Sequence, residues 1–170
     1  MIYAIFDSPL GPILLFSEDG FLTGAYLPEQ KPELPAHAVE CPNAPVIQQA
    51  MQLLDAYFSG KQPSPTLLPL RPRGSSFQEK VWQRLLQISY GETVTYSQIA
   101  KDFPGIMSAQ AVGQAVGKNP ISIIIPCHRV LGANNRLTGY AGGIECKAWL
   151  LEHEGLDHAN FIYPKKYREM

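Results

Sequence analysis

Short runs of alternating apolar and polar residues, separated by turn residues, open the chain. The apolar positions fall within MIYAIFD, ILLFS and FLTGAYL, which are separated by SPLGP and EDG. Alternation with a period of two indicates half-buried strands, and Gly, Pro and Asp between them indicate tight turns. The first 27 residues therefore predict a small antiparallel sheet of three strands.

The apolar spacing changes after a loop rich in proline and glutamate. Between Asn43 and Gly60, apolar residues recur in pairs three or four positions apart. This period is typical of a helix with one buried face, and asparagine and glycine are common at the two ends of helices. We therefore expect an amphipathic helix from Asn43 to Phe58. The Pro-rich stretch that follows, residues 61–74, indicates a connector.

Two capping signals mark helix starts in the second half of the chain. Ser76–Glu79 and Thr95–Gln98 each have a hydroxyl side chain followed three residues later by Glu or Gln, a pair that satisfies free backbone N–H groups of a first turn. Ser108 is placed to cap a third helix, AQAVGQAVG. Because a tight Pro104-Gly105 turn separates the second and third helices, the pattern predicts a helix-turn-helix.

The third of these helices has almost no large side chains. Its two glycines, Gly113 and Gly117, each cost a helix about 1 kcal/mol relative to alanine. The sequence leaves two reasons open for them. Either a neighbouring helix packs closely against the small residues, or the small residues let another molecule approach.

A run of β-branched residues, Ile121–Ile125, predicts a buried strand that leads to the candidate active site. A last helix is expected from Glu145 to Glu154. The expected fold class is mixed α/β (α+β), with two domains. These are residues 1–74, a small antiparallel sheet with a helix, and residues 75–170, a mostly helical domain with the helix-turn-helix and the buried active-site strand.

Composition narrows the class of protein. Of the 170 residues, 45% are hydrophobic and 17% are charged, which is typical of a folded globular protein and excludes a fibrous or disordered one. No apolar run approaches the ~20 residues of a membrane span, and the first residues do not resemble a signal peptide. The three cysteines lack disulfide-like spacing, which indicates reduced thiols. We expect a cytoplasmic protein with no membrane partner.

Charge is distributed unevenly although the net charge is only −1. Residues 1–70 carry two lysines against seven acidic residues, whereas residues 71–136 carry eight basic residues against three acidic ones. A polyanion would prefer the middle segment. An uneven but merely solvated surface would produce the same counts, so charge alone does not identify a nucleic-acid site.

The segment IIPCHRV, residues 124–130, holds the strongest candidate for chemistry. A thiol becomes a nucleophile when a base takes its proton, and His128 is the nearest base to Cys127. Adjacent side chains diverge in an extended segment. The chain must therefore turn sharply after Pro126, or a water must connect the two groups. A carboxylate would be needed to orient the imidazole, and candidates follow at the end of the last predicted helix: Glu152 and Glu154, with Glu145 a weaker one.

Cys127 could also serve without acting as an activated nucleophile. It could be a small hydrophobic core residue. It could bind zinc with ligands drawn from His37, Cys41, Cys146 and His153, but no paired ligand spacing supports this. A third alternative keeps the activated nucleophile but changes the reaction, to that of a cysteine hydrolase. Such an enzyme would need an oxyanion hole, of which the sequence gives no sign. We expect no metal and no cofactor.

Five motifs carry a family resemblance. In chain order, SFQEKVW, GKNP, IPCHRV, GYAGG and KAWLLEHEG resemble motifs of the O6-alkylguanine–DNA alkyltransferases, over Ser76 to Gly155. SPLGPILL, near the amino terminus, is similar to part of that family's first domain. The resemblance implies a DNA repair protein that flips an alkylated guanine out of the duplex and moves the O6-alkyl group irreversibly to its own cysteine, in a single turnover.

The resemblance also implies roles for single residues. The implied catalytic group comprises Cys127 as alkyl acceptor, His128 acting through a water, Glu154 orienting it, Asn119 as hinge residue, and Tyr96 pressing on a phosphate or donating to the guanine. The implied base pocket is lined by Tyr96, Val130, Tyr140 and Ala141. The implied DNA-binding residues, on and near a helix that enters the minor groove, are Gln110, Ala111, Gly113, Lys118 and Arg129. The implied partner is double-stranded DNA containing O6-alkylguanine, bound by a monomer.

The sequence departs from the family pattern at one position that matters. Where the family has an arginine early in the recognition helix, this chain has Gln110, which lacks the planar charge. We expect weaker extrusion of the base with the thiol chemistry intact. The alternative is a non-catalytic sensor of alkylated DNA, an alkyltransferase-like protein. Such relatives typically replace the cysteine, which is present here.

Overall fold

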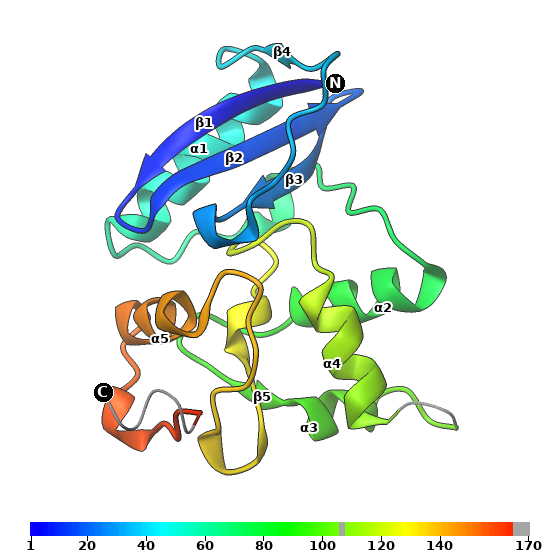
Figure 1. Ribbon diagram of the computed structural model, residues 1–170, viewed down its shortest axis with the longest axis vertical. Coiled ribbons are helices and arrows are strands. Elements are labelled where there is room, and N and C mark those ends of the chain that lie inside the picture. Colours follow the sequence, from blue (N-terminus) through cyan, green and yellow to red (C-terminus); the bar gives the residue numbers. More distant parts are fainter. Residues whose placement is uncertain (106–107, 165–170) are drawn as a thin grey trace. The chain divides into compact units, whose positions relative to one another are not determined.

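The computed structural model describes residues 1–105 and 108–164, and the chain divides into two compact units (Figure 1). Met1–Gly74 and Pro120–Ile125 form the first unit, and the second contains the other described residues, beginning at Ser75. The six residues Pro120–Ile125 thus belong with the amino-terminal part, although the predicted second domain contained them. The last six residues of that predicted domain lie outside the described part of the chain.

A four-stranded sheet forms the centre of the first unit. Its strands are β1 (Ile2–Ser8), β2 (Gly11–Glu18), β3 (Phe21–Tyr26) and β4 (Val39–Glu40). The order across the sheet is β3-β2-β1-β4. The first three strands pair antiparallel, as the alternating pattern predicts. The short β4 pairs parallel with β1 and comes from the segment expected to be a loop.

Helix α1 (Pro45–Phe58) lies along one face of this sheet (Figure 1). It begins one residue later than predicted, because Ala44 rather than Asn43 occupies the N-cap and Pro45 starts the first turn. Proline suits that position, since its fixed φ is helical and its missing N–H would have no partner there. The helix buries Val46, Ile47, Ala50, Leu54 and Tyr57.

The predicted buried strand over Ile121–Ile125 is wrong. Ile121 forms a single bridge with Ala25 of β3, and the chain then turns, with a hydrogen bond of 3.1 Å from the Ile125 N–H to the Ile121 carbonyl. Ile123 has a φ of 72°, which a strand does not allow. The prediction of burial is confirmed, since all five residues expose 4% or less of their surface.

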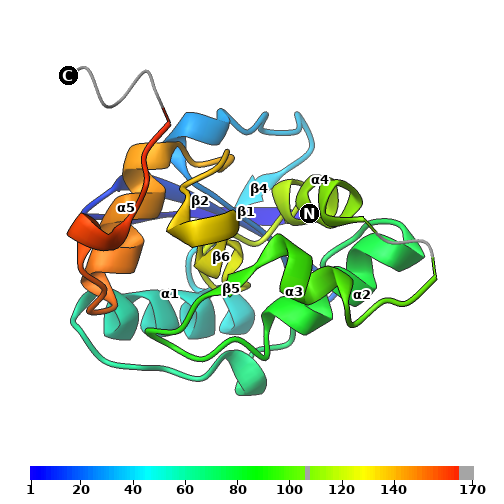
Figure 2. The same cartoon turned by 90° about the horizontal axis from the view of Figure 1, so that it is seen from below.

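The second unit consists mainly of short helices. They are α2 (Ser76–Leu85), α3 (Tyr96–Ala100), α4 (Ala109–Gly117) and α5 (Ile144–His153). Strands β5 (Val94–Thr95) and β6 (Val130–Leu131) pair in parallel. Helices α2 and α3 both contact α4, and Figure 2 shows the three together. In the described part of the chain, none of the helices has the length and apolar character to cross a membrane.

Side-chain caps define the starts of three of these helices. The capping box of α3 joins Thr95 and Gln98 as predicted, and Ser108 caps α4 as predicted. The box of α2 is displaced by one residue, because it joins Ser75 and Gln78 rather than Ser76 and Glu79. Two successive serines satisfy the same sequence pattern, and only the backbone conformation decides which one caps the helix.

Candidate active site

A turn of 3-10 helix, Cys127–Arg129, carries the candidate nucleophile and base. The Arg129 N–H donates to the Pro126 carbonyl over 3.1 Å, and the Val130 N–H closes the turn onto the Cys127 carbonyl. The chain therefore turns sharply after Pro126. This was one of the two predicted ways in which His128 could act as the base for Cys127. All three residues of the turn are buried.

Glu154 joins this turn to two other parts of the second unit. It follows the last residue of α5, and its carboxylate accepts from His128 Nε2, from Arg129 Nε over 2.7 Å and from the Gly91 N–H over 3.0 Å. Arg129 also donates from Nη1 to the Ile88 carbonyl over 2.7 Å. Among the three candidate carboxylates, Glu154 is the one paired with His128, whereas Glu145 and Glu152 are exposed.

Burial and hydrogen bonding set the charge states of this pair. Burial lowers the pKa of His128 despite the opposing effect of Glu154, so the imidazole is neutral near pH 7. Burial alone would raise the pKa of Glu154, but hydrogen bonds from His128 and Arg129 hold it well below its ordinary value of 4.5. A neutral imidazole that donates from Nε2 carries its lone pair on Nδ1. Nδ1 is therefore the atom of His128 that can accept a proton.

Cys127 exposes only 5% of its surface. Burial raises the pKa of its thiol, and three neighbours oppose that rise: the side chain of Asn119, the charge of Lys147 and the hydroxyl of Tyr140. Donors and cations stabilise a thiolate, so the pocket is built to compensate for burial. Asn119, itself 4% exposed, thus contacts the sulfur directly.

Tyr96 belongs to a group of polar contacts next to the cysteine. Its hydroxyl accepts from Thr138 Oγ1 over 3.2 Å, and burial raises its pKa. Lys147 belongs to the same group, with Nζ 3.4 Å from the Thr138 carbonyl and 5.8 Å from the centre of the Tyr96 ring. Neither Thr138 nor Lys147 was predicted from the sequence. For Lys147 a signal existed, because it falls on the apolar face of α5 together with Ile144, Ala148 and Leu151.

The three remaining predicted pocket residues differ in how far they are buried. Val130 is fully buried in β6, where it pairs with Val94. Tyr140 is half-buried, and its hydroxyl lies near enough to Cys127 to favour the thiolate. Ala141 is exposed, in the glycine-rich loop before α5. Of these three, the structure brings Tyr140 to the sulfur.

Four of the predicted DNA-binding residues lie on α4 or at its end. Gln110 and Lys118 are exposed, and Ala111 and Gly113 are half-buried. A Cβ added at Gly113 would meet the Tyr96 ring at 3.7 Å, which is ordinary contact, and one at Gly117 would meet no described atom within 4 Å. Packing against the described residues therefore does not require a glycine at Gly117.

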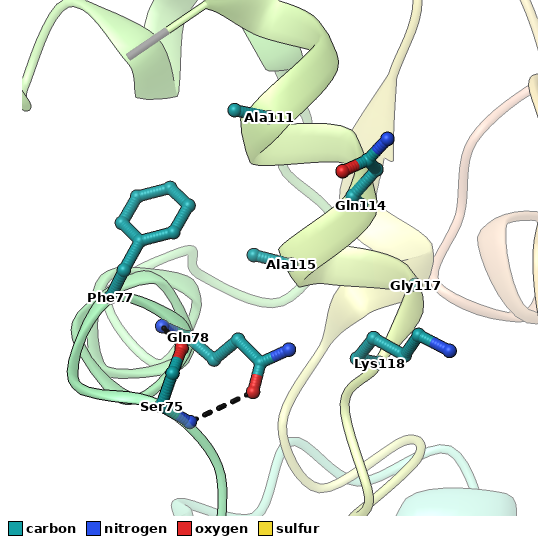
Figure 3. Close-up of a pocket in the computed structure, with 8 residues that line it drawn as sticks. All are labelled: Ser75, Phe77, Gln78, Ala111, Gln114, Ala115, Gly117 and Lys118. Carbon is teal, nitrogen blue, oxygen red and sulfur yellow. Dashed lines mark hydrogen bonds between the residues drawn. The ribbon is translucent and has the colours of Figure 1, made fainter. Parts of the chain in front are cut away.

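A groove of about 700 Å³ runs between α4 and the start of α2 (Figure 3). Gln78 forms part of its α2 wall and is held by the capping hydrogen bond from the Ser75 N–H. Ala111 and Ala115 present small side chains on the α4 wall, and Lys118 and Gln114 add polar groups. The exposed side of α4 thus combines small residues with hydrogen-bonding side chains.

Arg129, the fifth predicted DNA-binding residue, has a different position. Its guanidinium is engaged by Glu154 and the Ile88 carbonyl, and its side chain is only 11% exposed. A group held in this way cannot reach a phosphate without breaking the network around His128. The structure therefore assigns Arg129 to the support of Glu154 instead.

The alternative of a metal site receives no support from the described residues. Within residues 1–105 and 108–164, no group of three or more His, Cys, Asp or Glu side chains is arranged to hold a metal ion. Two of the candidate zinc ligands, Cys41 and Cys146, are free thiols, as is Cys127.

Comparison with known proteins finds matches to the same family over both parts of the chain. Residues 76–156 match the family model described as the DNA binding domain of 6-O-methylguanine DNA methyltransferase, and residues 1–72 match the one described as its ribonuclease-like domain. A methylated-DNA–protein-cysteine methyltransferase from Methanosarcina acetivorans is 45% identical over 161 residues, covering 91% of this chain and 99% of the relative. One from Haemophilus influenzae is 36% identical and covers 99% of this chain and 98% of the relative.

A solved structure extends the likeness to three dimensions. The crystal structure of Mycobacterium tuberculosis OGT in complex with DNA superposes with a TM-score of 0.81 at 41% identity, covering 95% of each chain. The mixed α/β fold predicted from the sequence is thereby confirmed. By sequence and by fold, the chain belongs to the 6-O-methylguanine DNA methyltransferase family.

Proposed function

We propose that this protein repairs DNA by transferring the alkyl group of O6-alkylguanine to Sγ of Cys127. The observation that carries this proposal is the arrangement of one buried turn, in which the thiol of Cys127 is followed by a neutral His128 oriented by Glu154. The names of the relatives, methylated-DNA–protein-cysteine methyltransferases, support the same activity.

The transfer follows from the charge states of these groups. The thiol proton passes to Nδ1 of His128 through a water, and the sulfur forms a bond to the alkyl carbon. The bond between that carbon and O6 breaks, and its electron pair stays on the guanine, which takes up a proton. Glu154 stabilises the imidazolium that forms, because its own low pKa keeps it ionised. The thioether product is stable, so each molecule reacts once.

The substrate is double-stranded DNA, bound by a monomer with α4 in the minor groove. The lack of side-chain bulk at Gly117 lets a helix come close to the groove floor, and exposed Gln110 and Lys118 supply hydrogen bonds and charge. The DNA complex of the Mycobacterium tuberculosis relative supports DNA as the partner. Free thiols at all three cysteines fit a reducing compartment, the cytoplasm.

The alkylated base enters a pocket beside Cys127 after it leaves the stack. Tyr96 and Tyr140 both interact with Cys127, which supports them as walls of this pocket, and we expect Val130 and Ala141 to line it further out. Aromatic rings suit a flipped base, because they stack on it without requiring a particular sequence around it. Asn119 donates to the sulfur and so assists the departure of the thiol proton.

The experiment is intact-protein mass measurement after mixing with a duplex that holds one O6-methylguanine. We expect a gain of one methyl group, mapped to the peptide that contains Cys127 and saturating at one per molecule. Cys127→Ala should gain nothing and keep its affinity for the duplex, whereas the control Cys41→Ala should react like the unmodified protein. Lesion-dependent binding with no mass gain in the unmodified protein would instead identify the sensor, for which Gln110 is the feature in favour.

A further inference from the structure

The two oxygens of the Glu154 carboxylate have different partners. Oε1 accepts from Arg129 Nε over 2.7 Å and from the Gly91 N–H over 3.0 Å, whereas Oε2 accepts from Nε2 of His128. Glu154 is only 6% exposed, so a hydrogen bond lost here is not replaced by bulk water. The two donors on Oε1 therefore keep the carboxylate from rotating, and Oε2 stays directed at the imidazole.

Arg129 connects this carboxylate to a turn that follows α2. Its second donor, Nη1, reaches the Ile88 carbonyl over 2.7 Å, and the centre of the Tyr90 ring lies 5.7 Å from its Cζ. The same turn supplies the Gly91 N–H that reaches Oε1. A guanidinium presents its N–H groups in a rigid planar fork, so this one side chain fixes the distance between the carboxylate and the turn.

The turn is shaped for this close approach. Gly91 has a φ of 76°, and a Cβ added there would meet the Glu154 carbonyl oxygen at 3.1 Å. Both features favour glycine. Strands β5 and β6 then pair Val94 with Val130, which holds the chain after the turn beside the chain after Arg129. The contact between Arg129 and the turn therefore rests on paired backbone as well as on side chains.

Charge acts together with this geometry at His128. Three charged groups influence its imidazole: Glu154 after α5, Arg129 in the same 3-10 turn and Lys147 on α5. Burial and the two cations lower the pKa of His128, whereas Glu154 raises it. Tyr90, the titratable side chain of the turn after α2, stays neutral near pH 7 because burial raises its pKa. Removing the charge of Arg129 should therefore favour the imidazolium, which has no lone pair for the thiol proton.

We propose that Arg129 is a positioning residue for the transfer reaction, which clamps Glu154 against the turn Ile88–Gly91 and so holds His128 ready to act as the base. The inference rests on the proposed function for its role in repair, but the clamp itself belongs to the protein without DNA. Arg129 acts in two ways. Its fork fixes the carboxylate that orients the imidazole, and its charge keeps that imidazole neutral until the thiol proton arrives.

The test follows the imidazole of His128 by NMR across a pH series without DNA, and the single-turnover rate of methyl transfer over the same range. Arg129→Lys keeps the charge without the fork, and Arg129→Met keeps neither. The Met variant should move the midpoint of His128, and with it the acid limb of the rate profile, upward by about one pH unit. The Lys variant should keep the midpoint but transfer about tenfold more slowly at every pH. The control Arg84→Met, which breaks a partly exposed pair with Asp102, should do neither.

Three results would overturn the proposal. The first is a folded Met variant in which the midpoint of His128 is unchanged. The second is a Lys variant that transfers as fast as the unmodified protein. The third is weaker binding to duplex DNA in both variants with an unaltered rate profile at saturating duplex, which would return Arg129 to the DNA interface.

A second measurement uses the unmutated chain and does not depend on how the variants fold. Exchange of the Arg129 Nε–H with solvent, followed by nitrogen-15 NMR, reports whether the guanidinium stays in its clamp in solution. The exchange should be at least about tenfold slower than at the Arg84 Nε–H, because the pair of Arg84 is more open to water. Equal exchange at the two arginines would refute the clamp.

These results separate the inference from the proposed function. A midpoint shift in Arg129→Met together with no methyl transfer from DNA by the unmodified protein would retain the clamp and reject the repair activity. Methyl transfer with the same rate and pH dependence in the unmodified protein and both Arg129 variants would retain the activity and reject the role of Arg129.

Discussion

Replacing Glu154 by glutamine removes one negative charge from the network around His128 while keeping the size of the side chain. The carboxylate accepts hydrogen bonds from three donors, two of them on His128 and Arg129. An amide has one oxygen and one NH2 group, so its NH2 either faces the Arg129 donor or faces Nε2 and forces His128 into the tautomer that has no lone pair on Nδ1. A hydrogen bond to a charged group contributes about 1.5–3 kcal/mol, and leaving one member of a buried ion pair costs about 3–5 kcal/mol. We expect a loss of about 3 kcal/mol in the free energy of unfolding at pH 7.

The same substitution should slow the transfer reaction. Without the carboxylate, the tautomer and orientation of His128 are no longer set, and positioned general bases contribute about 100-fold to 10,000-fold in rate. We expect methyl transfer about a hundredfold slower, measured in a single turnover with duplex in excess. Glu145→Gln, an exposed substitution on the same helix, is the matched control. A Glu154→Gln protein that reacts as fast as the control would mean that His128 does not serve as the base.

The stability effect also has a defined pH dependence. The pKa of Glu154 is lower in the folded protein than its ordinary value of 4.5, so the folded state binds fewer protons over that interval. The stability that Glu154 contributes is therefore fully present above its ordinary pKa and is lost as the pH falls toward the lower folded value. Urea unfolding gives the free energies of unfolding of the unmodified protein and of Glu154→Gln. The difference between the two should be smaller below pH 4 than at pH 7. A constant difference would show that the ion pair is not its source.

Two further substitutions test the DNA-binding surface. Gly117→Ala adds a methyl group where no described atom lies within 4 Å, so the free energy of unfolding should stay equal or rise by up to about 1 kcal/mol, while affinity for duplex DNA should fall; unaltered affinity in a binding titration would remove α4 from the interface. Gln110→Arg adds a planar charge to an exposed position and should speed methyl transfer from duplex DNA without altering the reaction of Cys127 with iodoacetamide. Equal transfer rates for the two proteins would show that Gln110 does not limit base extrusion.

Local signals account for the parts of the fold that were predicted well. The first three strands and the caps at Thr95 and Ser108 depend on residues only a few positions apart, and these were confirmed. The run Ile121–Ile125 is different. Its composition correctly indicated burial, but a turn buries isoleucine as well as a strand does, and Ile123 adopts a left-handed conformation that its residue type disfavours. Contacts with β3, distant in the sequence, decide the conformation there.

The candidate site was predictable only in part for the same reason. Cys127 and His128 are neighbours in the sequence, so their association needed no fold. The pairing of His128 with Glu154 spans 26 residues and came from a resemblance rather than from spacing. The buried position of Arg129 could not be inferred, because basic residues are usually exposed and only the folded unit places it inside; for Lys147 the apolar face of α5 offered a signal that was not used.

The short turn that holds Cys127, His128 and Arg129 fixes the number of residues that can separate Pro126 from Val130. A strand would send alternate side chains to two faces, whereas a 3-10 helix has about three residues per turn and sends three successive side chains about 120° apart. One side chain meets Asn119 and the next two share Glu154. Inserting or deleting one residue here would rotate all of them away from their partners together. Between Pro126 and Val130 the spacing should thus tolerate no change, even where single substitutions are accepted.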